Sequence, residues 1–103
     1  MDIHQRKIPI KPKDSYHGAS VQELYTQGMK HIRSRNSYEK AFEYLIQSAS
    51  MEHPKAQYNI GVLYEFGLGV EQSFKDAAMW YSKSKTNGCE EATLALIRVI
   101  KKQ

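Results

Sequence analysis

Disulfide-forming cysteine pairs, long apolar runs and secretion signals are all missing from this chain of 103 residues. Cys89 is the single cysteine, so no disulfide can form within the chain, which is typical of a reducing compartment. No run of about 18 apolar residues occurs, so the sequence predicts no membrane-spanning helix. The first residues lack the apolar core of a signal peptide, and Pro9 and Pro12 would break the helix of a mitochondrial presequence. We therefore expect an intracellular location, in the cytoplasm, nucleus or mitochondrial matrix, and no secretion.

Signatures of catalysis are equally scarce. None of the four histidines has a second metal ligand three or four residues away on a helix, so no metal site is expected. Gly67-Leu68-Gly69 lacks the preceding strand and the following Lys-Ser/Thr of a phosphate-binding loop. Cys89 lies where a turn enters a helix, which can activate a thiol, although a lone cysteine is usually structural. The sequence therefore predicts a protein that is not an enzyme and has no cofactor.

Net charge is small, +4, and the positive charge is concentrated at the ends of the chain and in one loop. A basic end can bind nucleic acid, anionic lipid or an acidic partner, but it can also be ordinary solvated surface. A dense basic stripe with interleaved aromatic residues is lacking, so a nucleic-acid-associated role is the secondary interpretation. The residues of this candidate basic patch are Arg6, Lys7, Lys11, Lys13, Arg33, Arg35, Lys101 and Lys102.

What the chain does contain is an internal repeat. Residues 38–64, moved forward by 36 positions, fall on residues 74–100 with their apolar positions in register. Ala41 then matches Ala77, Tyr44 matches Trp80, and Ser48 matches Ser84. A fixed period of this length indicates a stack of supersecondary units, none of which can bury its apolar face alone. Such a stack is typical of an interaction scaffold.

The repeat reads as helices throughout, because no stretch alternates as a half-buried strand does. Five helices are predicted, over about 21–33, 37–50, 54–66, 74–86 and from about 90 to the terminal cations. Their start signals are Ser20 with Glu23, Asn36 with Glu39, Pro54, and Ser73 with Asp76. Short connections make consecutive helices antiparallel neighbours.

Two domains of different character are expected. Residues 1–19 form a basic arm that is either extended or disordered, and that docks on a partner or packs along the surface of the rest of the chain. Residues 20–103 form the helical repeat domain. Within it Gly28 and Gly61 lie in the middle of helices, where glycine costs about 1 kcal/mol relative to alanine. We expect the paired helix to approach closely at these points, with Tyr64 and either Trp80 or Tyr81 filling the remaining space.

Residues 56–70 read A-Q-Y-N-I-G-V-L-Y-E-F-G-L-G-V, residues 75–81 read K-D-A-A-M-W-Y, and N-G-C-E-E-A follows at residues 87–92. This pattern resembles the Sel-one-like repeat, a relative of the tetratricopeptide repeat, over one full unit at residues 56–91. Residues 21–55 resemble a shorter, tetratricopeptide-like unit. Residues 92–103 are similar to the first helix of a third repeat in which Ile97 replaces the glycine. The resemblance implies an all-α, right-handed superhelix of about two and a half hairpins.

Members of that family are mostly adaptors, so the resemblance implies a protein–protein adaptor or scaffold subunit, as part of a multi-subunit complex. An enzyme-regulating accessory subunit is an alternative that the sequence does not separate from it. In stacked hairpins the first helices line the concave face, and that stripe should bind a peptide or protein. Several of its members could instead belong to the core, and Asn59 could bond within the fold. The candidate residues are Tyr25, Met29, Ile32, Tyr58, Asn59, Val62, Phe66, Leu94 and Arg98.

Overall fold

The computed structural model describes residues 19–34 and 37–103, and these form five α-helices and no strand. In chain order the helices are α2 (Val21–Ser34), α3 (Tyr38–Ser50), α4 (Pro54–Phe66), α5 (Phe74–Thr86) and α6 (Glu91–Ile100). Each predicted helix is confirmed, with its bounds within about a residue of those expected. The expected arm lies outside the described residues apart from Ala19.

Polar side chains at the predicted positions begin the helices. Ser20 and Glu23 form a reciprocal capping box before α2, with each side chain accepting from the other residue's backbone N–H. Ser73 caps α5 by accepting from the N–H of Asp76, and His53 caps α4 by accepting from the N–H of Ala56. For α3 the cap is Ser37, which accepts from the N–H of Lys40. Asn36, the expected start signal there, lies outside the described residues.

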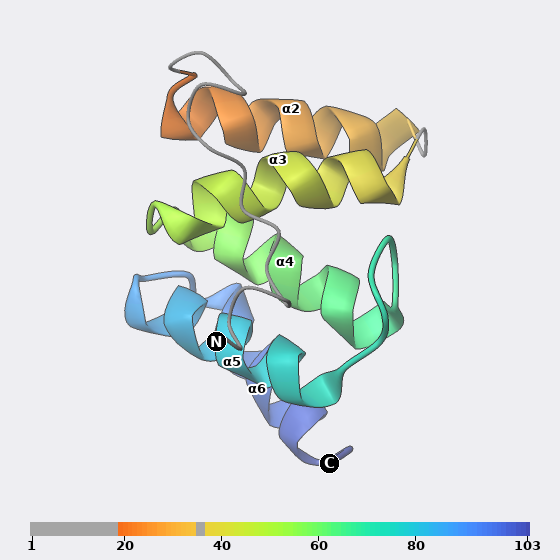
Figure 1. Ribbon diagram of the computed structural model, residues 1–103. Coiled ribbons are helices and arrows are strands. Elements are labelled where there is room, and N and C mark those ends of the chain that lie inside the picture. Colours follow the sequence, from red (N-terminus) through yellow and green to blue (C-terminus); the bar gives the residue numbers. More distant parts are fainter. Residues whose placement is uncertain (1–18, 35–36) are drawn as a thin grey trace, which may run out of the picture.

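The helices stack in the order in which they occur in the chain (Figure 1). Helix α2 packs on α3, α3 on α4, α4 on α5, and α5 on α6, and α4 also touches α6. The arrangement is two hairpins, α2/α3 and α4/α5, followed by α6, the first helix of a third hairpin. This is the predicted all-α stack of about two and a half helical hairpins. Within the described ranges, no helix combines the length and the apolar character that crossing a membrane requires.

Glycine at the middle of α2 and of α4 lets the paired helix approach, as expected. A Cβ atom placed on Gly28 would lie 2.5 Å from Cγ of Leu45, and one on Gly61 would lie 2.6 Å from the ring of Tyr81. Leu45 and Tyr81 are equivalent positions of the 36-residue repeat, and both are fully buried. Of the two aromatic residues considered for this place, Tyr81 therefore fills it. Tyr64 instead makes an edge-to-face contact with Phe42 of α3, with ring centroids 5.7 Å apart.

A repeated serine joins the two helices of each hairpin, where the second helix ends and the first helix begins. The hydroxyl of Ser48 donates to the backbone oxygen of Val21 at 2.9 Å, and the hydroxyl of Ser84 donates to that of Pro54 at 2.8 Å. Both serines are fully buried. Their conserved spacing within the chain therefore has a structural cause, because each fastens the end of a second helix to the first turn of its own first helix.

Candidate protein-binding surfaces

The stripe predicted on the first helices, here called the first-helix face, is built from α2, α4 and α6. Five of its nine residues are half-buried and pack against the core while keeping part of their surface in solvent, namely Tyr25, Met29, Ile32, Tyr58 and Val62. Phe66 and Leu94 are more open, with 53% and 72% of their surface exposed. The face therefore presents aromatic and aliphatic side chains that are held in place by their contacts with the buried core.

Two of the predicted residues are engaged within the fold. The side-chain amide of Asn59 donates to the backbone oxygen of Lys55, one turn earlier in the same helix, at 2.8 Å. Arg98 donates from Nε and Nη2 to the two carboxylate oxygens of Glu65, at 2.8 and 2.7 Å. Arg98 thus holds α6 against α4, and its guanidinium has this internal partner in addition to its exposed surface.

Glu65 is a functional residue of the fold that the sequence reading missed. Its side chain is fully buried, and besides Arg98 it accepts from the hydroxyl of Tyr81 at 2.8 Å and lies 3.5 Å from Nζ of Lys102. The bonds from Arg98, supported by Tyr81 and the charges of Arg98 and Lys102, outweigh burial and lower the pKa of Glu65. Burial and the Glu65 carboxylate raise the pKa of Tyr81. The only hint in the sequence was a charged residue between Tyr64 and Phe66.

A hollow of about 600 Å³ opens where the N-terminal ends of α2, α4 and α6 meet, next to the first-helix face. Its wall includes a stacked pair, Tyr25 on His53, with ring centroids 4.5 Å apart. Nε2 of His53 lies 3.1 Å from the side-chain oxygen of Gln22, which fixes the ring further. Burial lowers the pKa of His53. The remaining lining residues are Pro54, Lys55, Gly88, Cys89, Glu90 and Glu91.

Cys89 lies in the wall of this hollow, but 94% of its surface is covered, since only 6% is exposed. Its thiol donates to the Glu91 carboxylate at 3.2 Å. Among the described residues no group of three or more histidine, cysteine, aspartate or glutamate side chains is placed to hold a metal ion.

Helix α6 carries further exposed apolar side chains that the sequence reading did not include. Ile97 and Ile100 on α6 are 47% and 53% exposed and accompany Leu94. Nearby, Nζ of Lys102 lies 5.9 Å from the ring centre of Phe66 and 5.5 Å from that of Phe74. Ile97 holds the position that glycine occupies in α2 and α4, so no second helix can approach α6 as closely there.

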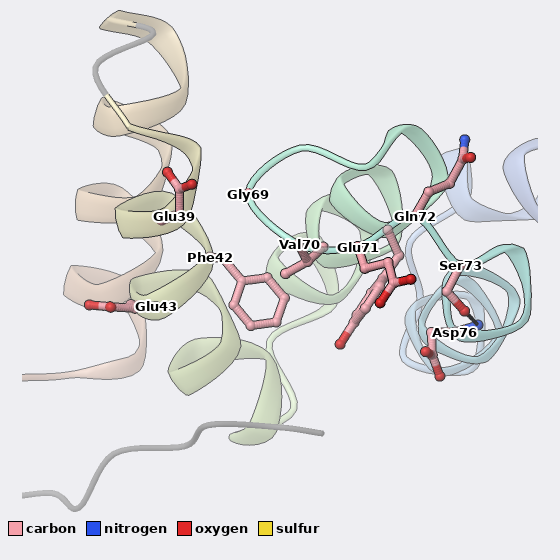
Figure 2. A pocket seen from close by; sticks show the side chains of 10 residues that line it. Glu39, Phe42, Glu43, Gly69, Val70, Glu71, Gln72, Ser73 and Asp76 are labelled. Carbon is pink, nitrogen blue, oxygen red and sulfur yellow. Dashed lines mark hydrogen bonds between the residues drawn. The ribbon is translucent and has the colours of Figure 1, made fainter. Parts of the chain in front are cut away.

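A second hollow, of about 670 Å³, lies between α3 and the start of α5, and no sequence pattern predicted it. Phe42, Tyr64 and Val70 supply its apolar part, and four acids line it, namely Glu39, Glu43, Glu71 and Asp76. Figure 2 shows Phe42 and Val70 pointing toward one another, with Glu71 and Asp76 on the α5 side and Glu39 and Glu43 on the α3 side. We call this hollow the acidic groove.

The predicted basic patch is only partly described. Arg33 is exposed at the end of α2, and Lys101 and Lys102 are exposed after α6. These are the first and last described helices of the stack (Figure 1). The other five cations, Arg6, Lys7, Lys11, Lys13 and Arg35, lie outside the described residues.

Comparison with known proteins bears directly on this architecture. The model of the Sel1 repeat family matches the chain twice, over residues 16–53 and 54–89. The chain belongs to the Sel1 repeat family. The first match also shows that the unit expected to be tetratricopeptide-like is itself a Sel1 repeat. Sel1 repeats generally mediate protein–protein interaction, and the family is typically non-catalytic.

Two curated relatives share part of the chain. The chitin synthase regulator SKT5 of Saccharomyces cerevisiae is 35% identical over 48 residues, which is 47% of this chain and 7% of that protein. The ERAD-associated E3 ubiquitin-protein ligase component HRD3B of Arabidopsis thaliana is 43% identical over 54 residues, which is 52% of this chain and 9% of that protein. The chain therefore spans less than a tenth of either relative. No solved structure matches the chain.

Proposed function

We propose that this Sel1 repeat chain is an adaptor that holds a segment of another protein on its first-helix face. The observation that carries the proposal is the row of half-buried apolar residues on α2 and α4, together with the more exposed side chains of Phe66 on α4 and Leu94 on α6. Aromatic and methionine side chains of this kind are enriched at the centres of protein interfaces. The partner segment would lie across the three first helices, with one end in the hollow beside Tyr25.

The proposed anchors are held in place before binding. Tyr58 lies against the buried ring of Tyr81, with ring centroids 5.6 Å apart, and Tyr25 is stacked on His53. Side chains that are already fixed lose less conformational entropy when a partner binds, which improves affinity for a given contact area. This supports a rigid recognition platform that does not have to fold around its partner.

The names of the two relatives support an accessory role. One is described as a regulator and the other as a ligase component, so each is named for its part in the work of other proteins. By analogy, we propose that this chain is a structural or regulatory subunit of a larger protein assembly, in an intracellular compartment.

Substitution of the two most exposed apolar residues of the face tests the proposal. The double variant Phe66→Ala with Leu94→Ala removes two exposed anchors, whereas Met79→Ala removes a 41% exposed apolar side chain from α5 and is the matched control. The immobilised proteins are incubated with extract of the source organism, and retained proteins are quantified by mass spectrometry. We expect proteins that wild type and Met79→Ala retain equally and that the double variant loses by about tenfold or more, since interface anchors often contribute 1–2 kcal/mol each.

Circular dichroism establishes that each variant is folded before binding is compared. If the folded double variant retains the same proteins as wild type, the first-helix face is not the binding surface. If binding instead falls steeply with salt and follows nucleic acid in the extract, the basic residues are responsible and the adaptor proposal fails.

A further inference from the structure

The acidic groove is a surface that neither the family nor the proposed function accounts for. It lies between α3 and the start of α5, which are second helices, whereas the proposed partner site is on the first helices. Its formation depends on the loop at residues 67–72. Gly67 and Gly69 adopt left-handed φ angles of 66° and 76°, and Gly69 comes so close to Tyr38 that a Cβ atom would lie 2.5 Å from the backbone carbonyl there. The loop thus places Val70 and Glu71 opposite α3.

The charge of the groove is of one sign. No lysine or arginine is among its described lining residues, and none of Glu39, Glu43, Glu71 and Asp76 forms an ion pair with another described residue. The recess therefore carries negative charge, and a cationic segment entering it would meet carboxylates that no described cation already pairs. Residues 41–97 carry seven acids against four lysines, so the imbalance extends beyond the groove itself.

A tyrosine hydroxyl at the apolar part of the groove is available as a hydrogen-bond donor. Tyr64 is 7% exposed and lines the groove, and its hydroxyl has no hydrogen-bond partner in the part of the chain that the structure describes. Burial, together with the nearby charge of Asp76, raises its pKa, so this hydroxyl stays protonated and available as a donor. An extended peptide backbone in the groove would offer a carbonyl acceptor to this hydroxyl.

The N-terminal residues of this same chain have the matching chemistry. Residues 6–13 read R-K-I-P-I-K-P-K, with four cations and two isoleucines. The two prolines favour an extended backbone and reduce the entropy lost on docking. Lysine and arginine side chains fit the acids on the rim, and Ile8 and Ile10 fit the ring surface of Phe42 and Tyr64.

The connection is also long enough. The backbone oxygen of Val21 is bonded to the hydroxyl of Ser48, so the chain enters α2 beside the C-terminal end of α3. From Ser48 back to Glu39 is nine residues of helix, or about 13 Å at 1.5 Å per residue. The six residues from Lys13 to Ala19 extend over about 20 Å. A tether of this length gives a local concentration in the millimolar range, so even a weak contact is populated.

We propose that residues 6–13 of this chain bind in its own acidic groove, with their cations on the rim acids and their isoleucines on Phe42 and Tyr64. The groove is then an intramolecular docking site on the side of the stack that carries the second helices. Binding of residues 6–13 leaves the first-helix face open, so the inference does not depend on the proposed function.

Zero-length carbodiimide cross-linking of the full-length chain tests the proposal, because it joins only lysine amines and carboxylates that touch. An equal mixture of ¹⁴N- and ¹⁵N-labelled chain is used, so that cross-links within one molecule carry a single isotope. We expect single-isotope cross-links from Lys7, Lys11 or Lys13 to the rim acids, above all Glu71 and Asp76, and their loss in 1 M salt. Cross-links spread evenly over Glu23, Glu90 and Glu91, or no cross-links from these lysines, would overturn the proposal. If every such cross-link joined a ¹⁴N peptide to a ¹⁵N peptide, the groove would bind residues 6–13 of a second copy, and this result would also overturn the proposal.

A matched pair of variants gives a second readout. Glu71→Gln removes a rim charge, and Glu90→Gln removes an exposed charge from the other hollow. Trypsin cleavage after Lys7 and Lys13 of the full-length chain should be about three- to tenfold faster in the double variant Glu71→Gln with Asp76→Asn, about twofold faster in Glu71→Gln, and unchanged in Glu90→Gln. Equal unfolding midpoints show that the fold is intact. Equal cleavage rates in all of these proteins would contradict docking in the groove.

Discussion

Arg98 on α6 and Glu65 on α4 form a bidentate ion pair, with N–O distances of 2.8 and 2.7 Å, and the Glu65 carboxylate has no solvent exposure. Because the hydroxyl of Tyr81 on α5 donates to the same carboxylate, three helices meet at one charged group. Helix α6 has no second helix of its own among the described residues. Glu65, Tyr81, Arg98 and Lys102, here called the Glu65 cluster, therefore hold α6 to α4 and α5 through polar contacts.

Removal of the arginine should destabilise the chain. In Arg98→Ala the buried carboxylate of Glu65 keeps Tyr81 and the more distant Lys102 but loses its two shortest charged bonds. Breaking a fully buried pair costs 3–5 kcal/mol, and since the Arg98 side chain is 45% exposed we expect about 2 kcal/mol. Urea denaturation measures the change. Arg33→Ala, at an exposed position near the end of α2, is the control and should shift the midpoint little. Equal effects of the two substitutions would show that the Glu65 pair contributes nothing.

Acid should weaken the same cluster. The pKa of Glu65 is lowered in the folded chain, chiefly by the bonds from Arg98. The cluster's contribution to the free energy of unfolding is therefore fully present above the unfolded-state pKa of about 4.3, and it is lost as pH falls through the lower folded-state pKa. Urea midpoints of wild type and Glu65→Gln, measured from pH 7 down to pH 3, should converge at low pH, because protonation removes from wild type what the substitution has already removed. A constant gap between the two proteins down to pH 3 would contradict this assignment.

Much of this fold could be predicted because its determinants are local and repeated. Capping residues such as Ser20 and Ser73 set where helices begin, and Gly28 and Gly61 mark the points where two helices touch. Each of these signals acts within a few residues or recurs after one period. These local and repeated signals were therefore enough to predict the five helices, their antiparallel pairing and the close contacts between them.

The surfaces were less predictable because they depend on groups that come together from distant parts of the chain. Arg98 and Glu65 are 33 residues apart, and nothing in the helical pattern distinguishes an arginine that faces a groove from one that reaches a buried carboxylate. The acidic groove likewise joins Glu39 on α3 to Glu71 in the loop before α5, and its closure depends on the path of a glycine-containing loop.

Alanine at the two helical glycines should separate helix propensity from packing. Alanine is favoured over glycine by about 1 kcal/mol in a helix interior, but at Gly61 its Cβ atom would lie 2.6 Å from two ring carbons of Tyr81. That ring is held at its far end by Glu65, so it cannot move aside easily, and we expect Gly61→Ala to lose about 2 kcal/mol overall. Gly28→Ala meets the more adaptable Leu45 side chain and should cost less. Urea midpoints test the order, and a stabilised Gly61→Ala would show that the contact at Tyr81 relaxes freely.

The two hairpin serines should behave alike in spite of their different surroundings. Ser48→Ala and Ser84→Ala each remove one buried hydroxyl that donates to a backbone oxygen at the start of the paired helix. Each substitution removes one hydrogen bond from a backbone oxygen, so it should lower the free energy of unfolding measured with urea by about 1 kcal/mol. Ser82→Ala, at an exposed position on α5, is the control and should be neutral within about 0.5 kcal/mol. Because the sites belong to separate hairpins, their effects should add in the double variant. A cost at Ser84 alone would mean that the two hairpins, although equivalent in sequence register, are not closed by the same interaction.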